Sequence, residues 1–219
     1  MTRIRMIAVA SASIFLLTGC GTVPGFNPGV AARVGDDTVT MNRVDDVTAA
    51  YCRAAEAQLQ EGQVLPQHYL RGQVAGALAL RVAVDQFAAE QGVSAADDYD
   101  QAVAQAREQL GSLPDDQVQA LIDVQGVPIY VQAVEKSVGE QQGDSGNAAT
   151  KAGEQAFLTW LDEQDIDLDP RFGVSIEKGV TAPADTSLSY GLSDTSTKAN
   201  ADQPDTDYAA ALPDTQRCG

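Results

Sequence analysis

Eight aspartates of this chain stand in adjacent pairs, and paired carboxylates are what metal binding or general acid–base catalysis would need. Each pair falls at a predicted turn or helix start, where aspartate caps the helix or interacts favourably with its dipole. We therefore predict that the pairs are structural and form no acidic site. They are Asp36–Asp37, Asp45–Asp46, Asp97–Asp98 and Asp115–Asp116.

A second acidic segment alternates strictly, with Asp165, Asp167 and Asp169 separated by Ile166 and Leu168. A calcium loop of the EF-hand type needs glycine at its sixth position and glutamate at its twelfth, and this segment has neither. The alternation is typical of a strand with one buried face. We predict a strand over residues 165–169, and weak calcium binding there is the alternative.

His68 is the only histidine of the chain. A zinc site rich in histidine is therefore excluded, and a Ser-His-Asp triad would have to use this one residue, which we expect to be structural. The sequence contains no G-x-S-x-G, no P-loop and no dinucleotide-binding glycine pattern. We predict a protein that is not an enzyme and has no catalytic, cofactor-binding or metal-binding residues.

The first of the three cysteines, Cys20, ends a segment with the layout of a secretory signal. Arg3 and Arg5 precede an apolar run from Met6 to Leu17, and Leu17-Thr18-Gly19-Cys20 resembles a bacterial lipobox. We predict a signal peptide over residues 1–19 and a lipidated tether over 20–29, with diacylglycerol on Cys20 and fatty acids such as palmitate. Two or more acyl chains would hold the protein on the extracytoplasmic face of the cell membrane.

The other two cysteines, Cys52 and Cys218, would then lie in an oxidising compartment, where disulfides persist. We predict that they form one disulfide, which would join the end of the chain to the first helix. Two free thiols are the alternative.

The chain is strongly acidic, with a formal net charge of −17 at pH 7. This charge argues against a nucleic-acid partner, whose phosphates require Lys and Arg, and against binding to anionic lipid by charge. Aromatic residues make up only 5% of the chain and alanine is abundant, so a helical core of small side chains is expected.

The chain is predicted to form one mostly α-helical domain over residues 30–173, followed by an acidic and largely disordered tail over 174–219. The domain opens with a hairpin at residues 32–41, and Thr40 or Asn42 caps the first helix. The strand at 165–169 is expected to join that hairpin. Six helices are predicted from apolar periodicity and from their Gly and Pro boundaries: 42–60, 66–91, 94–110, 114–125, 128–141 and 148–164.

The order of these parts is similar to that of the SurA/PrsA-type extracytoplasmic chaperones. "VAARVGDDTVT" (30–40) resembles the hairpin that opens their chaperone module, and "FAAEQGVSAADDYDQAV" (87–103) resembles their helix–Gly–helix junction. The end of the sixth helix with Asp169–Gly173 is similar to short SurA-like lipoproteins. The resemblance implies a SurA-N-like, trigger-factor-C-like helical module.

The same resemblance implies a function. It implies a lipid-anchored holding chaperone that binds unfolded or partly folded exported polypeptides between helices. SurA and PrsA proteins usually carry a parvulin domain, and nothing after Gly173 resembles one, so no prolyl isomerase activity is expected. The alternative is a non-catalytic envelope lipoprotein that docks one specific folded partner. No motif identifies residues that would line a client-binding surface.

Overall fold

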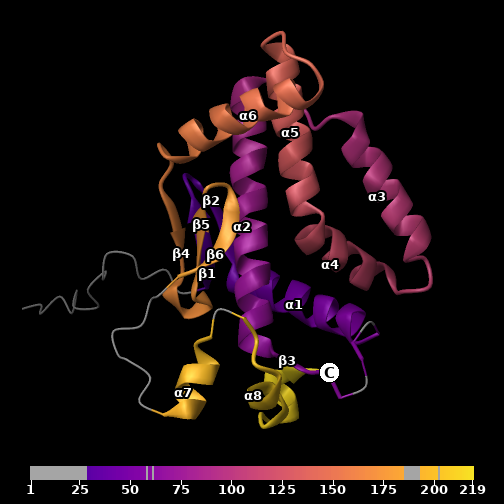
Figure 1. Ribbon diagram of the computed structural model, residues 1–219, viewed down its shortest axis with the longest axis vertical. Helices are drawn as coiled ribbons and strands as arrows, with labels where there is room; N and C mark the ends of the chain where they lie inside the picture. Colours follow the sequence, from indigo (N-terminus) through magenta and orange to yellow (C-terminus); the bar gives the residue numbers. More distant parts are fainter. Residues whose placement is uncertain (1–28, 58, 61, 185–192, 202) are drawn as a thin grey trace, which may run out of the picture.

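A computed structural model of the protein describes residues 29–57, 59–60, 62–184, 193–201 and 203–219. Within them the chain is mostly helical and is built around α2 (Gln67–Gln91), which runs the length of the molecule (Figure 1). Apolar residues lie all round α2, which is typical of a helix buried on every side. It ends at Gly92, whose φ of 67° is left-handed, as glycine at this position allows. The helix predicted over residues 66–91 is confirmed.

A three-stranded antiparallel sheet packs on one side of α2 (Figure 1). Its strands are β1 (Val30–Val34), β2 (Asp37–Thr40) and β4 (Ile166–Leu168), in the order β2-β1-β4. β1 pairs with β4 in the register Val34↔Ile166. The predicted hairpin and the strand that joins it from the far end of the domain are thus confirmed.

Helix α1 (Met41–Glu56) follows β2 directly. Its N-cap is Thr40, whose hydroxyl accepts a hydrogen bond from the amide of Arg43 at 3.2 Å. Because the helix already begins at Met41, Asp45 and Asp46 lie beyond its first turn, contrary to the prediction.

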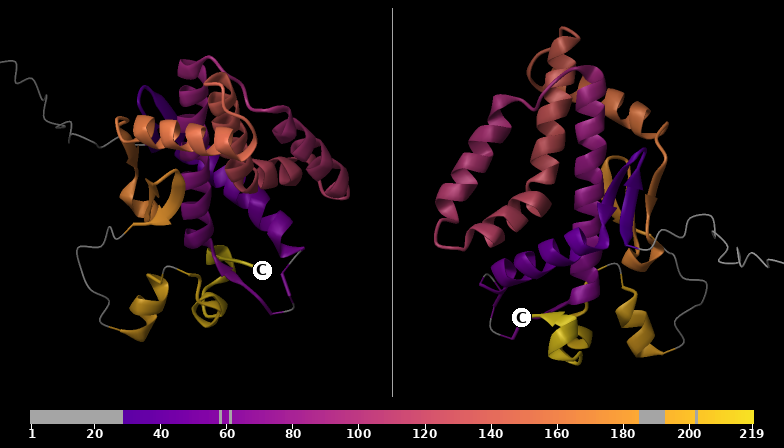
Figure 2. Two further views of the ribbon diagram at one scale, coloured as in Figure 1. Left: turned by 45° about the horizontal axis from the view of Figure 1, so that its top comes forward. Right: turned by 180° about the vertical axis from the view of Figure 1, so that it is seen from behind.

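Three helices form the sides of a triangle on the other side of α2 (Figure 2). They are α3 (Asp97–Gln109), α4 (Asp115–Gln125) and α5 (Val127–Gln141). α3 begins at Asp97, three residues later than predicted. Its N-cap is Ala96, which has no side chain that could accept a capping hydrogen bond.

Helix α6 (Gly146–Leu161) packs tightly against α5. A side chain at Gly139 would collide with the backbone of Ala149, and one at Gly153 with the backbone of Glu135. The two backbones can therefore approach only because both positions are glycine. Phe157 and Trp160 of α6 pack with Phe87 of α2 in the main core.

The chain after Gly173 was expected to be largely disordered, and its described residues instead form several short elements. β5 (Val174–Glu177) and β6 (Val180–Pro183) form a hairpin against α2, where a side chain at Gly72 would lie 2.6 Å from the carbonyl oxygen of Phe172. The 3-10 helix η1 (Pro170–Phe172) leads into the hairpin. The remaining elements are α7 (Asp194–Ala199), α8 (Thr206–Ala210), η2 (Asp214–Gln216) and β7 (Arg217–Cys218), which pairs with β3 (Leu65–Pro66).

Candidate functional site

Helix α3 is the least covered of the long helices of the protein. Its apolar stripe consists of Tyr99, Val103 and Ala106 together with the C-cap residue Leu110, and each of these is only partly buried. No residue of α3 is fully buried. A surface helix normally presents such a stripe to the core. The stripe of α3 therefore remains partly available on the molecular surface.

The N-terminal end of α3 is held by a cluster of rings and charges that also involves α2 and α5. The rings of Tyr99 and Tyr130 meet edge to face, with centroids 4.9 Å apart. Arg81 stacks on Tyr130, its Cζ 3.5 Å from the ring centroid, and donates to the hydroxyl of Tyr99 at 3.0 Å. The hydroxyl of Tyr130 donates to Asp85 at 2.6 Å. Burial, together with this bond to Asp85, raises the pKa of Tyr130 to about 12, so the phenol keeps its proton at neutral pH.

Polar contacts add to the attachment of α3 at both ends. The amide of Ala96 donates to the carbonyl of Ala133 at 3.2 Å, and Lys136 pairs with Asp98 at 2.7 Å. The hydrogen bond from Lys136 lowers the pKa of Asp98. Near the other end, Arg107 donates to Gln119 of α4 at 2.7 Å. These contacts attach α3 at both of its ends. The middle of the helix takes part in none of them.

A pocket of about 320 Å³ lies between α3, α5 and the start of α6. Ile129, which is 46% exposed, contributes a large apolar side chain to it. The lining of the pocket mixes polar and apolar groups, with one acidic and one basic side chain. The lining residues are Asp98, Tyr99, Ile129, Gln132, Ala133, Lys136, Gly146, Asn147 and Thr150.

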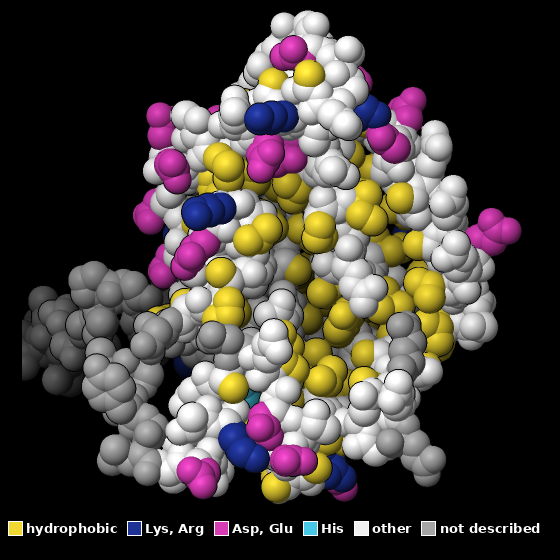
Figure 3. All heavy atoms as spheres, viewed as in Figure 1, with side chains coloured by type: hydrophobic (Ala, Val, Ile, Leu, Met, Phe, Trp, Pro, Cys, Tyr) yellow, Lys and Arg dark blue, Asp and Glu magenta, His cyan; other side chains and the backbone are white. Residues whose placement is uncertain are grey.

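Hydrophobic side chains gather on the same side of the molecule, over the part that α3, α4 and α5 occupy (Figure 3). Few charged side chains lie among them, and the charges of this face lie mostly toward its edges (Figure 3). The whole chain has a formal net charge of −17, and this face shows few of its charged side chains (Figure 3). We define the apolar face as the α3 stripe together with Ile129, which lines the same pocket as Tyr99.

Three of the four aspartate pairs lie at a turn or a helix start, as predicted, and Asp45–Asp46 lies within α1 instead. One member of each pair has a basic or amide partner on another element. Asp97–Asp98 and Asp115–Asp116 lie in the first turns of α3 and α4. The partnered residues are Asp37 with Gln86, Asp45 with Arg71, Asp98 with Lys136 and Asp116 with Arg53.

The three alternating aspartates are not gathered into a metal site among the described residues. Asp169 caps η1 by accepting from the amide of Arg171 at 3.0 Å, and its two oxygens receive the guanidinium of the same residue at 2.9 and 2.7 Å. This bidentate bond lowers the pKa of Asp169. Asp169 is thereby occupied by an arginine rather than left free for calcium.

His68 lies exposed in the first turn of α2 and has no hydrogen-bonded serine or carboxylate partner among the described residues. Its Nε2 is 3.2 Å from the carbonyl oxygen of Ala199, to which it donates in the tautomer that carries the proton there. Its ring meets Tyr208 edge-on, with centroids 6.2 Å apart. These contacts position the C-terminal segment, so the structure gives this histidine a packing role.

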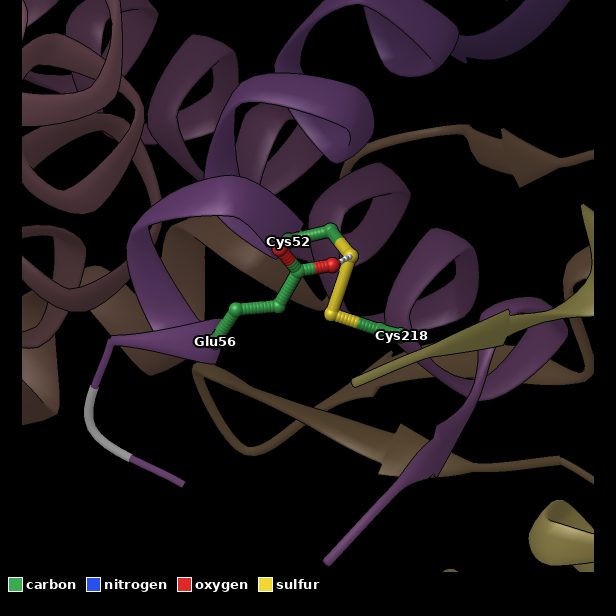
Figure 4. Close-up of side chains that lie close together, drawn as sticks. All are labelled: Cys52, Glu56 and Cys218. Atoms are coloured by element: carbon green, nitrogen blue, oxygen red, sulfur yellow. Dashed lines mark hydrogen bonds between the residues drawn. A yellow bond between two sulfur atoms is a disulfide. The ribbon is translucent and has the colours of Figure 1, made fainter. Parts of the chain in front are cut away.

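Cys52 and Cys218 form the predicted disulfide, with their Cα atoms 5.6 Å apart (Figure 4). Glu56 lies beside it, with Oε1 3.4 Å from the sulfur of Cys52. Within the described part of the chain, these three residues are the one group of side chains close enough to hold a metal ion. With the sulfurs bonded to each other, neither is the thiolate that a metal would bind.

Cys20 lies outside the described residues, as do the predicted signal and most of the tether. Among the helices that the structure describes, none combines the length and the apolarity needed to cross a membrane.

Sequence reasoning missed the ring cluster that anchors α3. Arg81 and Asp85 stand four residues apart in the mostly apolar middle of α2, where a charged pair is unexpected unless other groups hold it. This spacing could have indicated a polar cluster on α2. The two tyrosines come from other helices, however, and the sequence does not show that they meet Arg81.

Comparison with known proteins adds no relative: no protein-family model, no curated protein and no solved structure matches this chain.

Proposed function

We propose that this protein is a holding chaperone of the SurA-N type, lipid-anchored on the extracytoplasmic face of the cell membrane, that binds unfolded or partly folded exported polypeptides. One observation supports the proposal above the others. The middle of α3 carries apolar side chains that the protein itself buries only in part, on a side of the molecule where Figure 3 shows few charged side chains.

Burial drives the proposed binding. An apolar side chain of an unfolded client gains about 25 cal/mol for each Å² that it buries against such a stripe. The apolar residues of an unfolded chain are exposed, whereas those of a folded one are buried already, so the unfolded chain gains more. This mechanism needs no ATP, metal or catalytic residue, and prolyl isomerase activity is not part of the proposal.

The dimensions of the apolar face suit a short extended segment. α3 has 13 residues and so is about 20 Å long, which matches about six residues of extended chain. The pocket beside it is about 320 Å³ and is lined partly by polar groups, which suits one side chain of such a segment. The net charge of −17 disfavours acidic segments, so neutral or basic apolar segments are the expected clients.

The proposal is tested with the chain from Gly21 onward, which keeps every described residue. We expect stoichiometric amounts of it to suppress the aggregation of a chemically denatured model protein, measured by light scattering. Val103→Asp places a charge in the stripe and should abolish most of the suppression. Ala104→Asp is the matched control, because Ala104 is exposed on the same helix and should tolerate the same charge.

Circular dichroism melts of both variants check that the fold survives. Absence of suppression by the parent chain would refute the proposal, as would equal suppression by the two variants. If the parent chain instead crosslinks in a one-to-one ratio to a single folded envelope protein, the function is docking of a specific partner.

Membrane anchoring is tested separately in cells. We expect labelled palmitate to be incorporated into the protein, and Cys20→Ser to release the protein from the membrane fraction. Cys52→Ser should leave the labelling unchanged, because Cys52 belongs to the disulfide. Labelling that persists in Cys20→Ser would contradict this part of the proposal.

A further inference from the structure

The described residues from Ser193 to Gly219, which we call the C-terminal strap, lie at the end of the molecule where α1 and α2 meet (Figure 1). The strap contains α7, α8, η2 and β7. Its inner surface is well packed, since Ala209 and Cys218 have no exposed area. It therefore covers part of the body of the protein.

Few bonds attach the strap to the body. β7 pairs with β3 over only two residues on each strand, and one of the two on β3 is Pro66, which has no N–H to donate. His68 contacts the carbonyl of Ala199 and the ring of Tyr208. The disulfide between Cys52 in α1 and Cys218 is the covalent cross-link that ties the end of the strap to the body.

The body does not depend on the strap for its core. Among the residues that the structure describes, the main hydrophobic cluster, together with the side chains packed against it, has no member after Ile176. Removal of the strap would therefore uncover a surface without removing any side chain from this cluster.

The disulfide is accessible from one side. Cys218 is fully buried, whereas Cys52 is only partly buried, near the end of α1. The carboxylate of Glu56 beside Cys52 can accept the proton of a Cys52 thiol but makes no hydrogen bond to the sulfur of a disulfide, which carries no proton (Figure 4). Cys52 is thus the more exposed of the two cysteines, and its thiol, once reduced, has an acceptor already in place.

We propose that the Cys52–Cys218 disulfide is a redox lock: its reduction by a dithiol releases the C-terminal strap while the body stays folded. A thiolate of the dithiol attacks the sulfur of Cys52, the S–S bond breaks, and Cys218 leaves as a thiolate that takes up a proton. The second thiol of the reductant then attacks the mixed disulfide and frees Cys52. The two cysteines gain two electrons and two protons, and the dithiol becomes a disulfide.

Release would uncover an apolar corner between α1 and α2. The backbone of Leu65 loses its partner strand, and Val64, which is nearly buried, lies where Gly219 now packs. A side chain at Gly219 would lie 2.9 Å from Leu59, which shows how closely the last residue covers this corner. The proposed redox lock does not depend on the proposed chaperone function. It would operate in the same way if the apolar face had another function.

The test is hydrogen–deuterium exchange of the chain from Gly21 onward, with and without dithiothreitol. We expect amides of α8 and η2 to exchange at least about tenfold faster after reduction, while amides of α2 keep their protection. The double variant Cys52→Ala/Cys218→Ala should show the fast strap exchange without reductant and should not respond to dithiothreitol. Alkylation followed by mass spectrometry should count two new thiols.

Three results would overturn the proposal. Loss of α2 protection in parallel with the strap would make the disulfide a support of the whole fold. Unchanged strap exchange in the double variant would show that non-covalent contacts suffice. Failure of dithiothreitol to produce two alkylatable thiols would show that the disulfide is closed to reductant.

Discussion

Helix α5 packs against two neighbours in opposite ways. Toward α6, glycines at 139 and 153 bring the two backbones into contact. Toward α3, it offers the ring of Tyr130 and the ammonium of Lys136, and no residue of α3 becomes fully buried. One side of α5 is thus part of the scaffold, and the other borders a surface that stays open.

The contrast teaches how a small helical protein can keep an apolar surface exposed without losing its fold. Backbone contact at glycines leaves no space for water or for a slipped register. The α3 side relies on one exposed ion pair, Lys136–Asp98, which contributes little to stability, on a few hydrogen bonds and on one ring cluster. The partial exposure of the α3 stripe therefore does not weaken the α5–α6 packing that keeps the protein folded.

The largest expected effect is on the α5–α6 contact. Gly153→Ala places a methyl group against the backbone of Glu135 and should lower the free energy of unfolding by about 3 kcal/mol, measured by urea denaturation. Gly111→Ala is the matched control, since its new methyl would have its nearest neighbour at 3.3 Å, the carbonyl of Glu108. Equal stability of the two variants would show that the backbone contact is not a determinant of the scaffold.

The next effect concerns Glu135, which is only 8% exposed on α5. Burial, together with the nearby charge of Glu154, raises the pKa of Glu135 to about 7 from its ordinary 4.5. Between these values the folded protein keeps a proton that the unfolded chain has lost, so stability falls as the pH rises through this window and levels off above pH 7. The loss should be about 2 kcal/mol, less than the full shift because water reaches part of the carboxylate.

Glu135→Gln should remove this slope and stabilise the protein at pH 8, measured as the free energy of unfolding in urea from pH 5 to pH 8. Glu140→Gln, on an exposed part of the same helix, should keep the parent slope. A parent protein whose stability rises between pH 5 and pH 7 would contradict the assignment.

A smaller and more local effect is expected at the ring cluster. Tyr99→Leu removes the ring that contacts Tyr130 and Arg81, and should cost about 1 kcal/mol of stability. Amides of α3 should exchange faster with solvent, while those of α6 should not change. Tyr99→Phe keeps the ring and loses only the hydroxyl that accepts from Arg81, so it should change α3 exchange less.

The parts of the fold that sequence could predict are those with a local signal. Alternation at Ile166 and Leu168 predicted the third strand, and glycine at position 92 predicted the end of the central helix. The pairing of Cys52 with Cys218 followed from the number of cysteines left after Cys20. Each of these signals depends on neighbouring residues or on a count, and none requires knowledge of which helices meet.

The parts that sequence missed depend on contacts between distant elements. The backbone contact at Gly153 exists only because α5 and α6 cross there, and a glycine within a helix signals no partner by itself. The β5–β6 hairpin lies in a segment that looks disordered in composition, and it forms against α2 where Gly76 leaves room for Thr181. The apolar face likewise arises from the position of α3, which no motif specifies.

The smallest expected effect distinguishes aromatic from ionic anchoring of α3. Asp98→Asn breaks the exposed pair with Lys136 and should leave the free energy of unfolding unchanged within error, because water already screens the pair. Exchange at the first turn of α3 should rise slightly in low salt and less in 0.5 M NaCl, where the Debye length of about 4 Å weakens the pair. If Asp98→Asn loosens α3 as much as Tyr99→Leu does, the ion pair is the anchor. α3 would then be released by salt, which an aromatic anchor does not allow.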